Sequence, residues 1–470
     1  MGGLSKKAFQ YNKLRKETAL PSLTLDAGGL LFSSPLVSTN LLDQGKITAE
    51  GIAESYSLMG YDGVGITGRD LAAGLDFLQD IEKKSTFSWL SANIISNKNG
   101  KPVFKPFITI EAGSQHAIII GLTQGDPYSK KSVGPDNAII SWDSALPAVF
   151  SSIKDPGNFI VLLTDLPLET CKEITKNYPD INLIIRATGT GNNLAPELIA
   201  EKTLLTATGK QGKYIGAMKI DWENNTIWDT DPRKKLIEKH RELERLDWQI
   251  NRYQNRPELL SRYRALEEQR VKIRTEVDAL KHEIEKEPPT GIRKSTFSNQ
   301  FIAIDKILPD DPKVLEVVNN IKLATSDRAK NGTEAGINNS FTAYTGWRKC
   351  GECHQSQLRT WQNSRHARAY LTLISKNQQF NRQCVFCHVT GMTKDAAANA
   401  PGLPPELQHV GCESCHGPGT AHANAPTDKK LLPVTAKTCA QCHVPDHDDD
   451  FNFKRDLDKL HCSTAIPEKS

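Results

Sequence analysis

Cys350-Gly351-Glu352-Cys353-His354 is the first of four pentapeptides that share one pattern, two cysteines separated by two residues and followed directly by histidine. The other three copies are Cys384-Val385-Phe386-Cys387-His388, Cys412-Glu413-Ser414-Cys415-His416 and Cys439-Ala440-Gln441-Cys442-His443. This pattern is the attachment signature of c-type haem, in which both thiols bond to the porphyrin and the histidine ligates the iron. A zinc site built on paired cysteines does not require a histidine after every second cysteine. The sequence therefore predicts four covalently bound haem c groups.

The histidines of the C-terminal segment supply the predicted iron ligands. The motif histidines are the expected proximal ligands: His354, His388, His416 and His443. Only three of the 12 histidines of the chain lie before residue 346, and five non-motif histidines lie after it. A second histidine on an iron favours electron transfer, whereas a vacant position admits a substrate. The candidates for this second position are His366, His409, His422, His447 and His461.

The segment 346–470 leaves little polypeptide for each of four haems. The porphyrins must therefore form most of its hydrophobic interior. We expect a mainly helical and irregular tetrahaem domain, with short helices and loops wrapped around the haems. The turn-forming pairs Pro401-Gly402 and Pro404-Pro405 agree with this expectation.

The order of these motifs resembles the tetrahaem cytochrome c554 family. Matching features include Trp361 followed by His366-Ala367-Arg368-Ala369, and Gly417-Pro418-Gly419 followed by His422. The resemblance implies four distal ligands, His366, His422, His447 and His461, with His409 as the spare histidine. It also implies that one haem can remain five-coordinate. Which distal histidine serves which iron stays open at this point.

Residues 1–225 alternate apolar runs with helical patterns, which predicts an α/β domain with a sheet-based core. The predicted strands are bounded by turn residues and enriched in β-branched side chains: 23–32, 63–67, 89–95, 117–122, 159–164, 181–185 and 214–220. The predicted helices between them are 48–59, 71–81 and 168–178.

A second resemblance covers roughly residues 1–222. Leu23-Thr24-Leu25-Asp26-Ala27-Gly28-Gly29 is similar to a segment of the calcineurin-like metallophosphatases, in their periplasmic 5′-nucleotidase branch. Further similarity lies at Gly68-Arg69-Asp70, Leu90-Ser91-Ala92-Asn93 and Gly209-Lys210-Gln211-Gly212. The resemblance implies a layered β-sandwich with helices and two metal ions at the carboxyl ends of strands.

The metal ligands of that family are largely replaced in this chain. The aligned positions carry Gly29, Gly68, Arg69, Asp165, Thr188 and Thr190, of which only Asp165 is a carboxylate, and Asp70 is the one acidic residue left beside Gly68-Arg69. A two-metal hydrolytic site needs clustered Asp, Asn and His side chains. We therefore predict a non-catalytic metallophosphatase-like domain that acts as a scaffold or docking surface, and we assign no catalytic residue.

Residues 226–289 show the heptad pattern of packed helices. Apolar residues recur every seven positions in two runs, the first at Leu236, Leu243 and Ile250 and the second at Leu266, Ile273 and Leu280. Asn255-Arg256-Pro257 interrupts the pattern as a turn would. We expect an antiparallel, coiled-coil-like helical hairpin, which can pack on its own protein or join a second copy in a homo-oligomer.

The remaining boundary and localisation predictions rest on composition. Residues 290–345 are expected to be a connector, with a helix over 312–322 capped by Asp310 or Asp311. A net charge of +4 gives no indication of a nucleic-acid surface. The chain has no apolar run of about 18 residues that would span a membrane. Its first residues lack the apolar core of an export signal, although haem c attachment outside the cytoplasm predicts a periplasmic or extracellular protein.

The sequence favours an electron carrier that exchanges electrons with redox partner proteins. A multihaem oxidoreductase acting on a small nitrogen or sulfur species is the alternative, and a phosphohydrolase is the less favoured one. Of the ten cysteines, only Cys171 and Cys462 lie outside the haem motifs. Their spacing does not indicate a disulfide.

Overall fold

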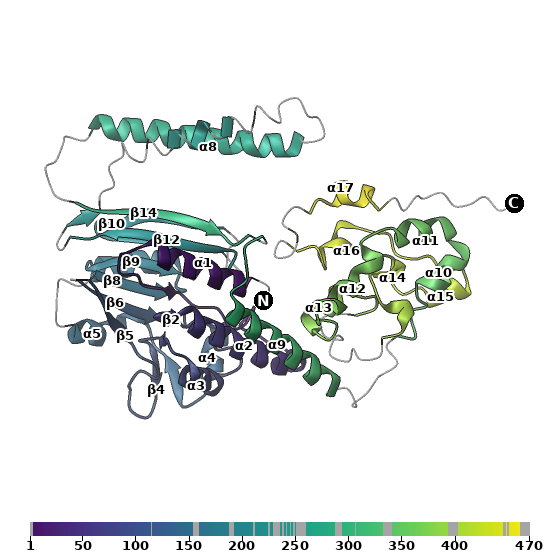
Figure 1. The fold of residues 1–470 in the computed structure, drawn as a ribbon, viewed down its shortest axis with the longest axis horizontal. Helices are drawn as coiled ribbons and strands as arrows, with labels where there is room; N and C mark the ends of the chain where they lie inside the picture. Colours follow the sequence, from purple (N-terminus) through teal and green to yellow (C-terminus); the bar gives the residue numbers. More distant parts are fainter. Residues whose placement is uncertain are drawn as a thin grey trace.

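Six strands form the central sheet of the N-terminal part in the computed structural model, in the order β10-β11-β9-β8-β6-β5 (Figure 1). The inner strands are parallel neighbours: β6 (Gln115–Leu122), β8 (Phe159–Thr164), β9 (Ile181–Arg186) and β11 (Thr203–Ala207). The edge strands β5 (Phe107–Ala112) and β10 (Leu194–Ala200) are antiparallel to their neighbours. Parallel strands covered on both faces carry continuous apolar runs, and all six residues of β8 are buried.

The structure describes most of the chain. The described residues are 3–113, 115–153, 159–187, 192–209, 212–223, 226–228, parts of 236–250, 260–286, 294–305, 307–331, 341–392, 403–444, 448 and 451–460.

Helices cover one face of the central sheet and further strands cover the other. The helices α5 (Trp142–Ser152) and α6 (Leu168–Asn177) bury apolar side chains on the first face, including the fully buried Cys171. The second face packs against side chains of β12 (Tyr214–Asp221) and β14 (Lys294–Ala303). This mixed α/β architecture of layered sheets and helices agrees with the sequence prediction.

A second, parallel sheet extends the core on the side of the chain's first residues. It contains β1 (Leu25–Asp26), β2 (Gly63–Gly65) and β3 (Ser88–Leu90). Its apolar cluster includes side chains of α2 (Thr39–Met59) and α3 (Leu75–Lys84). The shorter elements α4 (Pro127–Ser132), β4 (Ile94–Ser96) and β7 (Asn137–Ile139) lie beside it.

Much of the predicted connector 290–345 packs on the N-terminal part. β14 pairs with β12 along eight residues and with β13 (Ile227–Trp228). The helix α9 (Pro312–Asn331) buries Val314 and Val318 against α1 (Leu4–Glu17) and α2. The helix starts where the sequence predicts it, because Asp311 accepts a hydrogen bond from the backbone N–H of Val314 at 3.1 Å. The sequence analysis does not predict β14, a strand with several polar residues that pairs with β12 and β13.

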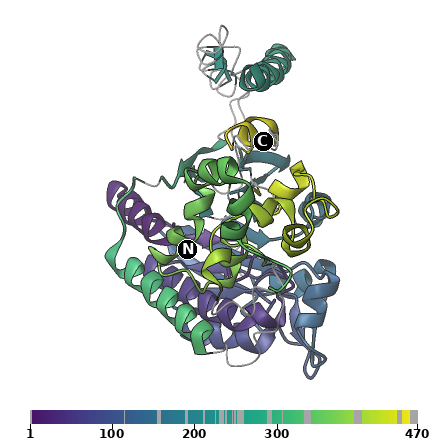
Figure 2. The same cartoon turned by 90° about the vertical axis from the view of Figure 1, so that its right-hand side faces the viewer.

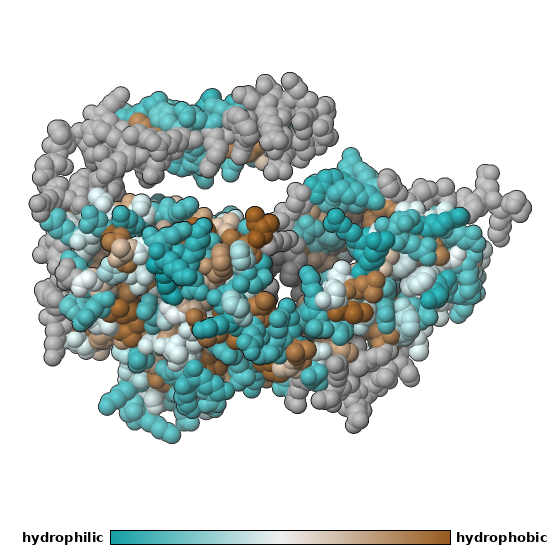
Figure 3. Space-filling view, in the orientation of Figure 1, coloured by the Kyte–Doolittle hydropathy of each residue, from teal (hydrophilic) through white to brown (hydrophobic). Residues whose placement is uncertain are grey.

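The helix α8 (Leu260–Lys286) lies in the segment for which the sequence predicts a helical hairpin (Figure 1). Lys239 pairs with Glu276 at 2.7 Å, and Asp247 pairs with Arg270 at 3.5 Å. The two pairs run in opposite directions along the chain, as antiparallel packing requires. The turn predicted at 255–257 lies outside the described residues. Figure 3 shows a largely hydrophilic surface on the described part of this segment.

The C-terminal part is built from short helices beside the N-terminal part (Figures 1 and 2). They are α10 (Trp347–Cys353), α11 (Gln355–Gln362), α12 (Ala369–Ile374), α13 (Arg382–His388), α14 (Cys412–His416), α15 (Thr420–Asn424), α16 (Ala436–Ala440) and α17 (Phe453–Asp458). The side-chain amide of Gln44 donates to the carbonyls of Thr325 and Phe380, at 3.1 and 2.9 Å, and so links α2, α9 and this part. Among the described helices, none is both long and apolar enough to cross a membrane.

Candidate haem-binding centre

The cysteine pairs lie on short helices or at their ends. The first three motifs fall on α10, α13 and α14, and the fourth begins on α16. Residues three positions apart lie on the same face of a helix. Both thiols of a motif are therefore presented to one side, which is what attachment to a single porphyrin needs. The protein core nearby is small, with five buried apolar residues in its cluster: Leu373, Val385, Val389, Leu403 and Leu407.

Two motif histidines each face a second histidine. The ring of His354 lies 6.3 Å from that of His422, with an interplanar angle of 22°. The ring of His366 lies 6.1 Å from that of His443, with an interplanar angle of 71°. These pairs connect residues far apart in the sequence.

The separation of the rings can be compared with that of two axial ligands. An imidazole nitrogen bonds a first-row metal ion at about 2.0–2.1 Å, and ring bonds of about 1.33 Å give a ring radius of about 1.1 Å. Two imidazoles on opposite sides of one ion therefore have centroids about 6.2–6.4 Å apart. The observed separations of 6.3 and 6.1 Å lie within this range and just below it, so both pairs are spaced to fit a haem with two histidine ligands.

Hydrogen bonds at Nδ1 fix the tautomers of four histidines. His388 donates to the carbonyl of Ala369 at 2.8 Å, and His416 donates to that of Leu432 at 3.3 Å. His422 donates to the carbonyl of Lys429 at 2.6 Å. His443 donates to the carboxylate of Asp448 at 2.6 Å. A carbonyl or carboxylate oxygen only accepts, so Nδ1 carries the proton. The lone pair of Nε2 remains free for a metal ion, as in most histidine ligands.

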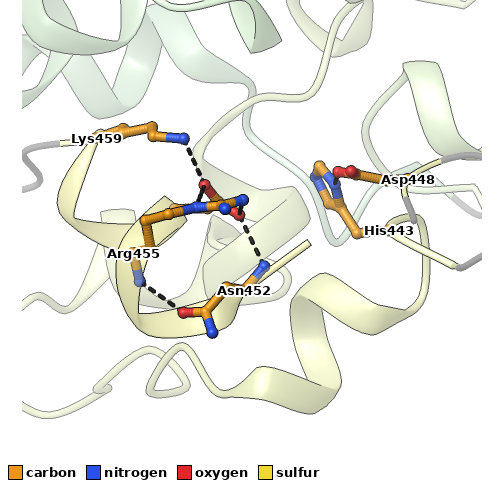
Figure 4. A network of polar contacts seen from close by, with 6 residues as sticks. His443, Asp448, Asn452, Arg455 and Lys459 are labelled. Carbon is orange, nitrogen blue, oxygen red and sulfur yellow. Dashed lines mark hydrogen bonds and ion pairs between the residues drawn. The ribbon is translucent and has the colours of Figure 1, made fainter. Parts of the chain in front are cut away.

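Asp448 is paired with a motif histidine. Its carboxylate accepts a hydrogen bond from Nδ1 of His443 at 2.6 Å (Figure 4). His447 and His461, two of the predicted distal ligands, lie outside the described residues. The next helix, α17, is capped by Asn452, which accepts from the backbone N–H of Arg455 at 3.0 Å.

His409 is held in another way. Its Nδ1 accepts a hydrogen bond from the backbone N–H of Tyr370 at 3.2 Å, and its φ is +79°.

For His388 and His416, no opposing histidine ring occurs within the described residues. Burial lowers the pKa of His366 and of His409. A lowered pKa favours the neutral imidazole, the form that ligates metal ions.

The attachment motifs are packed against one another. The thiols of Cys350 and Cys412 form a hydrogen bond, which, together with burial, raises the pKa of Cys350. The hydroxyl of Thr390, two residues after the second motif, lies 3.0 Å from that of Ser414 in the third. Val410 donates its backbone N–H to the carbonyl of His366 at 3.2 Å. These contacts hold the first three motifs close together.

Glu413 is a site residue that sequence reasoning missed. It lies between the cysteines of the third motif and is only 4% exposed. Its carboxylate accepts backbone hydrogen bonds from Thr345, Gly346 and Gly419, at 2.9, 2.8 and 2.7 Å. It thereby ties the third motif to the start of α10, which carries the first motif. The position of a glutamate within C-x-x-C gives no sequence signal for this role, because Glu352 occupies the same kind of position and is exposed.

Replacing Glu413 by glutamine is expected to destabilise the C-terminal part by about 2–4 kcal/mol, because buried charge-assisted hydrogen bonds are lost. Denaturation followed by the haem Soret band reports on this part of the chain. Glu352→Gln is the matched control and should change stability by less than about 1 kcal/mol, since its ion pair with Lys349 is exposed. Equal effects of the two substitutions would contradict the assigned role of Glu413.

The degenerate metal site of the N-terminal part is filled by protein contacts. Asp70 is fully buried and accepts hydrogen bonds from the backbone N–H groups of Gly29, Leu30, Leu31 and Thr67, and from the Thr67 hydroxyl. Gly29 has a φ of +77°, and a Cβ at this position would collide with the guanidinium of Arg69. Thr188 and Thr190 lie outside the described residues. Within the described residues, no cluster of three His, Cys, Asp or Glu side chains is arranged to hold a metal ion.

Asp165 has a perturbed carboxyl group near this site. Burial, with smaller contributions from Asp70 and Asp126, raises its pKa to about 7, although the backbone N–H of Gln124 donates to it at 2.7 Å. A carboxyl group with a raised pKa in the folded state stabilises the fold below its unfolded pKa, and this contribution is lost as the pH rises through the folded pKa. The affected window is therefore about pH 4–7.

Asp165→Asn is expected to stabilise the protein by about 2–4 kcal/mol at pH 8 and to leave stability nearly unchanged at pH 4. The amide retains an oxygen for the Gln124 N–H and carries no charge. Calorimetric unfolding at the two pH values measures the difference. Asp136→Asn, at an exposed position of the same domain, should show no such dependence on pH. Equal gains at both pH values would show that the charge of Asp165 is not the cause.

The attachment motifs and the opposed histidines resemble those of a multihaem c-type cytochrome, in a segment joined to an α/β domain. The family model described as "Cytochrome c554 and c-prime" matches residues 349–417. Cytochrome c-554 of Nitrosomonas europaea is 33% identical over 91 residues, which cover 16% of this chain and 39% of that protein. The C-terminal part of the chain therefore resembles the cytochrome c554 family, as the sequence predicts.

The N-terminal part resembles a different group of proteins. Protein UshA of Salmonella pullorum is 29% identical over 124 residues, which cover 26% of this chain and 22% of that protein. Sulfate thiohydrolase SoxB from Thermus thermophilus aligns in structure over 69% of this chain and 47% of that chain, with 14% identity and a TM-score of 0.45. Each match spans less than half of the relative's own length. The likeness to the 5′-nucleotidases and calcineurin-like metallophosphatases agrees with the resemblance drawn from the sequence.

Proposed function

We propose that this protein is an extracytoplasmic electron carrier that binds four haem c groups and exchanges electrons with redox partner proteins. The observation that carries the proposal is the spacing of His354 and His422, and of His366 and His443, at the distance of two ligands to one iron. Two histidines on an iron leave no position for a substrate and suit outer-sphere electron transfer. When bound, each haem supplies a one-electron redox centre.

The chain's own residues would hold and orient these groups. Eight cysteines would attach the porphyrins: Cys350, Cys353, Cys384, Cys387, Cys412, Cys415, Cys439 and Cys442. His354, His388, His416 and His443 would ligate the irons on one side, and His422 and His366 would oppose the first and the last of them. The acceptors at Nδ1 keep the rings oriented and make Nε2 a stronger ligand. The N-terminal part would serve as a scaffold or docking surface, a role supported by the contacts of Gln44 with Thr325 and Phe380.

Counting the spin states of the haems in the purified protein tests this proposal. Mass spectrometry and the pyridine haemochrome spectrum should give four haems per chain. Low-temperature EPR should show low-spin signals, and the reduced protein should bind little CO. One high-spin haem that binds CO stoichiometrically would contradict a pure carrier and favour an oxidoreductase with a substrate site at that iron.

A further inference from the structure

We propose that Asp448 lowers the reduction potential of the haem on the fourth motif, so that this haem, once reduced, is a stronger electron donor. The inference rests on the proposed electron carrier and assigns the tuning of one redox centre to one carboxylate. Asp448 is a positioning residue, because it acts on the iron only through His443. Its carboxylate lies 2.6 Å from Nδ1 of this motif histidine.

The motif histidines differ in the kind of group that accepts their Nδ1 proton. His388 and His416 donate to the neutral backbone carbonyls of Ala369 and Leu432. His443 donates to a carboxylate, and a hydrogen bond to an ionised acceptor is about twice as strong as one between neutral groups. Within the described residues, no other motif histidine pairs with an acidic side chain. The fourth motif is therefore distinguished by the charge behind its histidine.

Contacts within the segment keep the carboxylate and the ring of His443 together. The backbone N–H of Asp448 donates to the carbonyl of Val444 at 2.8 Å, which holds the carboxylate beside the motif. The ring of Phe451 is stacked on that of His443, with centroids 4.7 Å apart and an interplanar angle of 23°. The side chains of His443 and Asp448 are 34% and 37% exposed, so water screens their interaction only in part.

The cations beside this pair are engaged elsewhere. On α17, Arg455 and Lys459 both pair with Asp456, at 2.9 and 2.6 Å (Figure 4). Among the residues that the structure describes, no lysine or arginine forms an ion pair with Asp448. The negative charge of Asp448 is therefore directed at His443.

A carboxylate at Nδ1 changes how strongly the histidine donates electrons to iron. It draws the Nδ1 proton toward itself, so the imidazole gains negative charge and its Nε2 becomes a stronger ligand. This donation and the charge of Asp448 both stabilise ferric iron more than ferrous iron, because ferric iron carries one more positive charge. The reduction potential falls as a result, and release of an electron from this haem becomes more favourable.

Redox titration of the full holoprotein and its Asp448→Asn variant, followed by visible spectra and low-temperature EPR, tests the inference. Asparagine keeps an acceptor oxygen for Nδ1 without the charge, so the fourth motif becomes like the second and third. The equilibrium constant for one-electron reduction of one haem should rise about ten-fold, which corresponds to about 59 mV. Asp448→Glu retains the carboxylate and should keep most of the lowered potential.

The His366→Ala substitution identifies the haem that responds. It leaves His443 alone on the iron of the fourth motif, so the high-spin signal that this variant gains belongs to that haem. Adding Asp448→Asn should raise the potential at which this signal is lost on reduction. It should also lower the iron–histidine stretching frequency in the resonance Raman spectrum of the reduced protein, since the bond weakens. A merely structural role of Asp448 would change neither quantity.

Asp458→Asn is the matched control, because it removes the same charge from an exposed position at the end of α17. It should shift the potentials much less than Asp448→Asn does. A rise confined to the haem of the fourth motif supports the inference. An unchanged or lowered potential, or a shift equal to that of the control, would overturn it. The proposed electron carrier fails separately, through high-spin haem in the parent protein, whereas low-spin haems with an unshifted potential would overturn only the role of Asp448.

Discussion

Replacing His422 by alanine is expected to convert one low-spin haem to a high-spin haem and to create one CO-binding iron per chain. His422 opposes His354 at 6.3 Å between ring centroids, and its Nδ1 is held by the carbonyl of Lys429. The alanine leaves the first motif with its proximal histidine alone, so that iron gains an open position. Low-temperature EPR and CO difference spectra measure the change. His366→Ala should produce the same change at the haem of the fourth motif.

The control for the His422→Ala and His366→Ala substitutions is a histidine that faces no haem motif. His240 lies in the segment that packs against α8, and its Nδ1 contacts the carbonyl of Leu236. His240→Ala should leave the spin states of all haems unchanged. The double substitution of His422 and His366 should give two high-spin haems, because the two pairs are separate. If either single variant keeps every low-spin signal, the corresponding pairing of histidines is wrong.

The sequence predicts the haem attachment sites because covalent attachment demands fixed residue types at fixed spacing. It could not pair distal with proximal histidines, since His354 and His422 meet only through the folding of the segment between them. His422 and His366 were predicted as distal ligands, and the structure opposes both to motif histidines. His447 and His461 remain predictions. The carboxylates that support the site could not be assigned from the sequence. Asp448 faces His443, and Glu413 binds the backbone of residues 345 and 346, which are distant in the sequence.

In the N-terminal part, the apolar strands β6, β8 and β9 were predictable because buried parallel strands leave a continuous apolar run. β14 was not predicted, because its polar residues resemble a loop and its partner β12 lies on the other side of the hairpin. The helix α1 was missed for a related reason: its polar, basic surface gives little periodicity, and it packs through Ala8 against α9. The sequence alone predicts that the metal ligands of the metallophosphatase family are replaced in this chain. It does not show that a Cβ at position 29 would collide with the guanidinium of Arg69.

Asp70→Ala is expected to have the largest effect on stability in the N-terminal part, a loss of about 4 kcal/mol or more. Its carboxylate accepts five hydrogen bonds in a site without solvent exposure. Alanine would leave buried N–H groups without acceptors, and each such group costs about 1–3 kcal/mol. Hydrogen–deuterium exchange of the full chain measures the effect, because the amides of residues 29–31 should lose protection first.

Asp80→Ala provides the control, since Asp80 is exposed and pairs only with Lys83 on the same helix. It should leave the protection of residues 29–31 unchanged, because the ion pair of Asp80 lies at the surface. Asp70→Asn should fall between the two, because an amide retains one acceptor oxygen but lacks the charge. The test also separates two roles for Asp70. If Asp70→Ala left exchange at 29–31 unchanged but abolished binding of a divalent metal ion, Asp70 would be a ligand and the phosphohydrolase alternative would regain support. Loss of protection without any metal dependence would establish that this carboxylate organises the loop on which Arg69 rests.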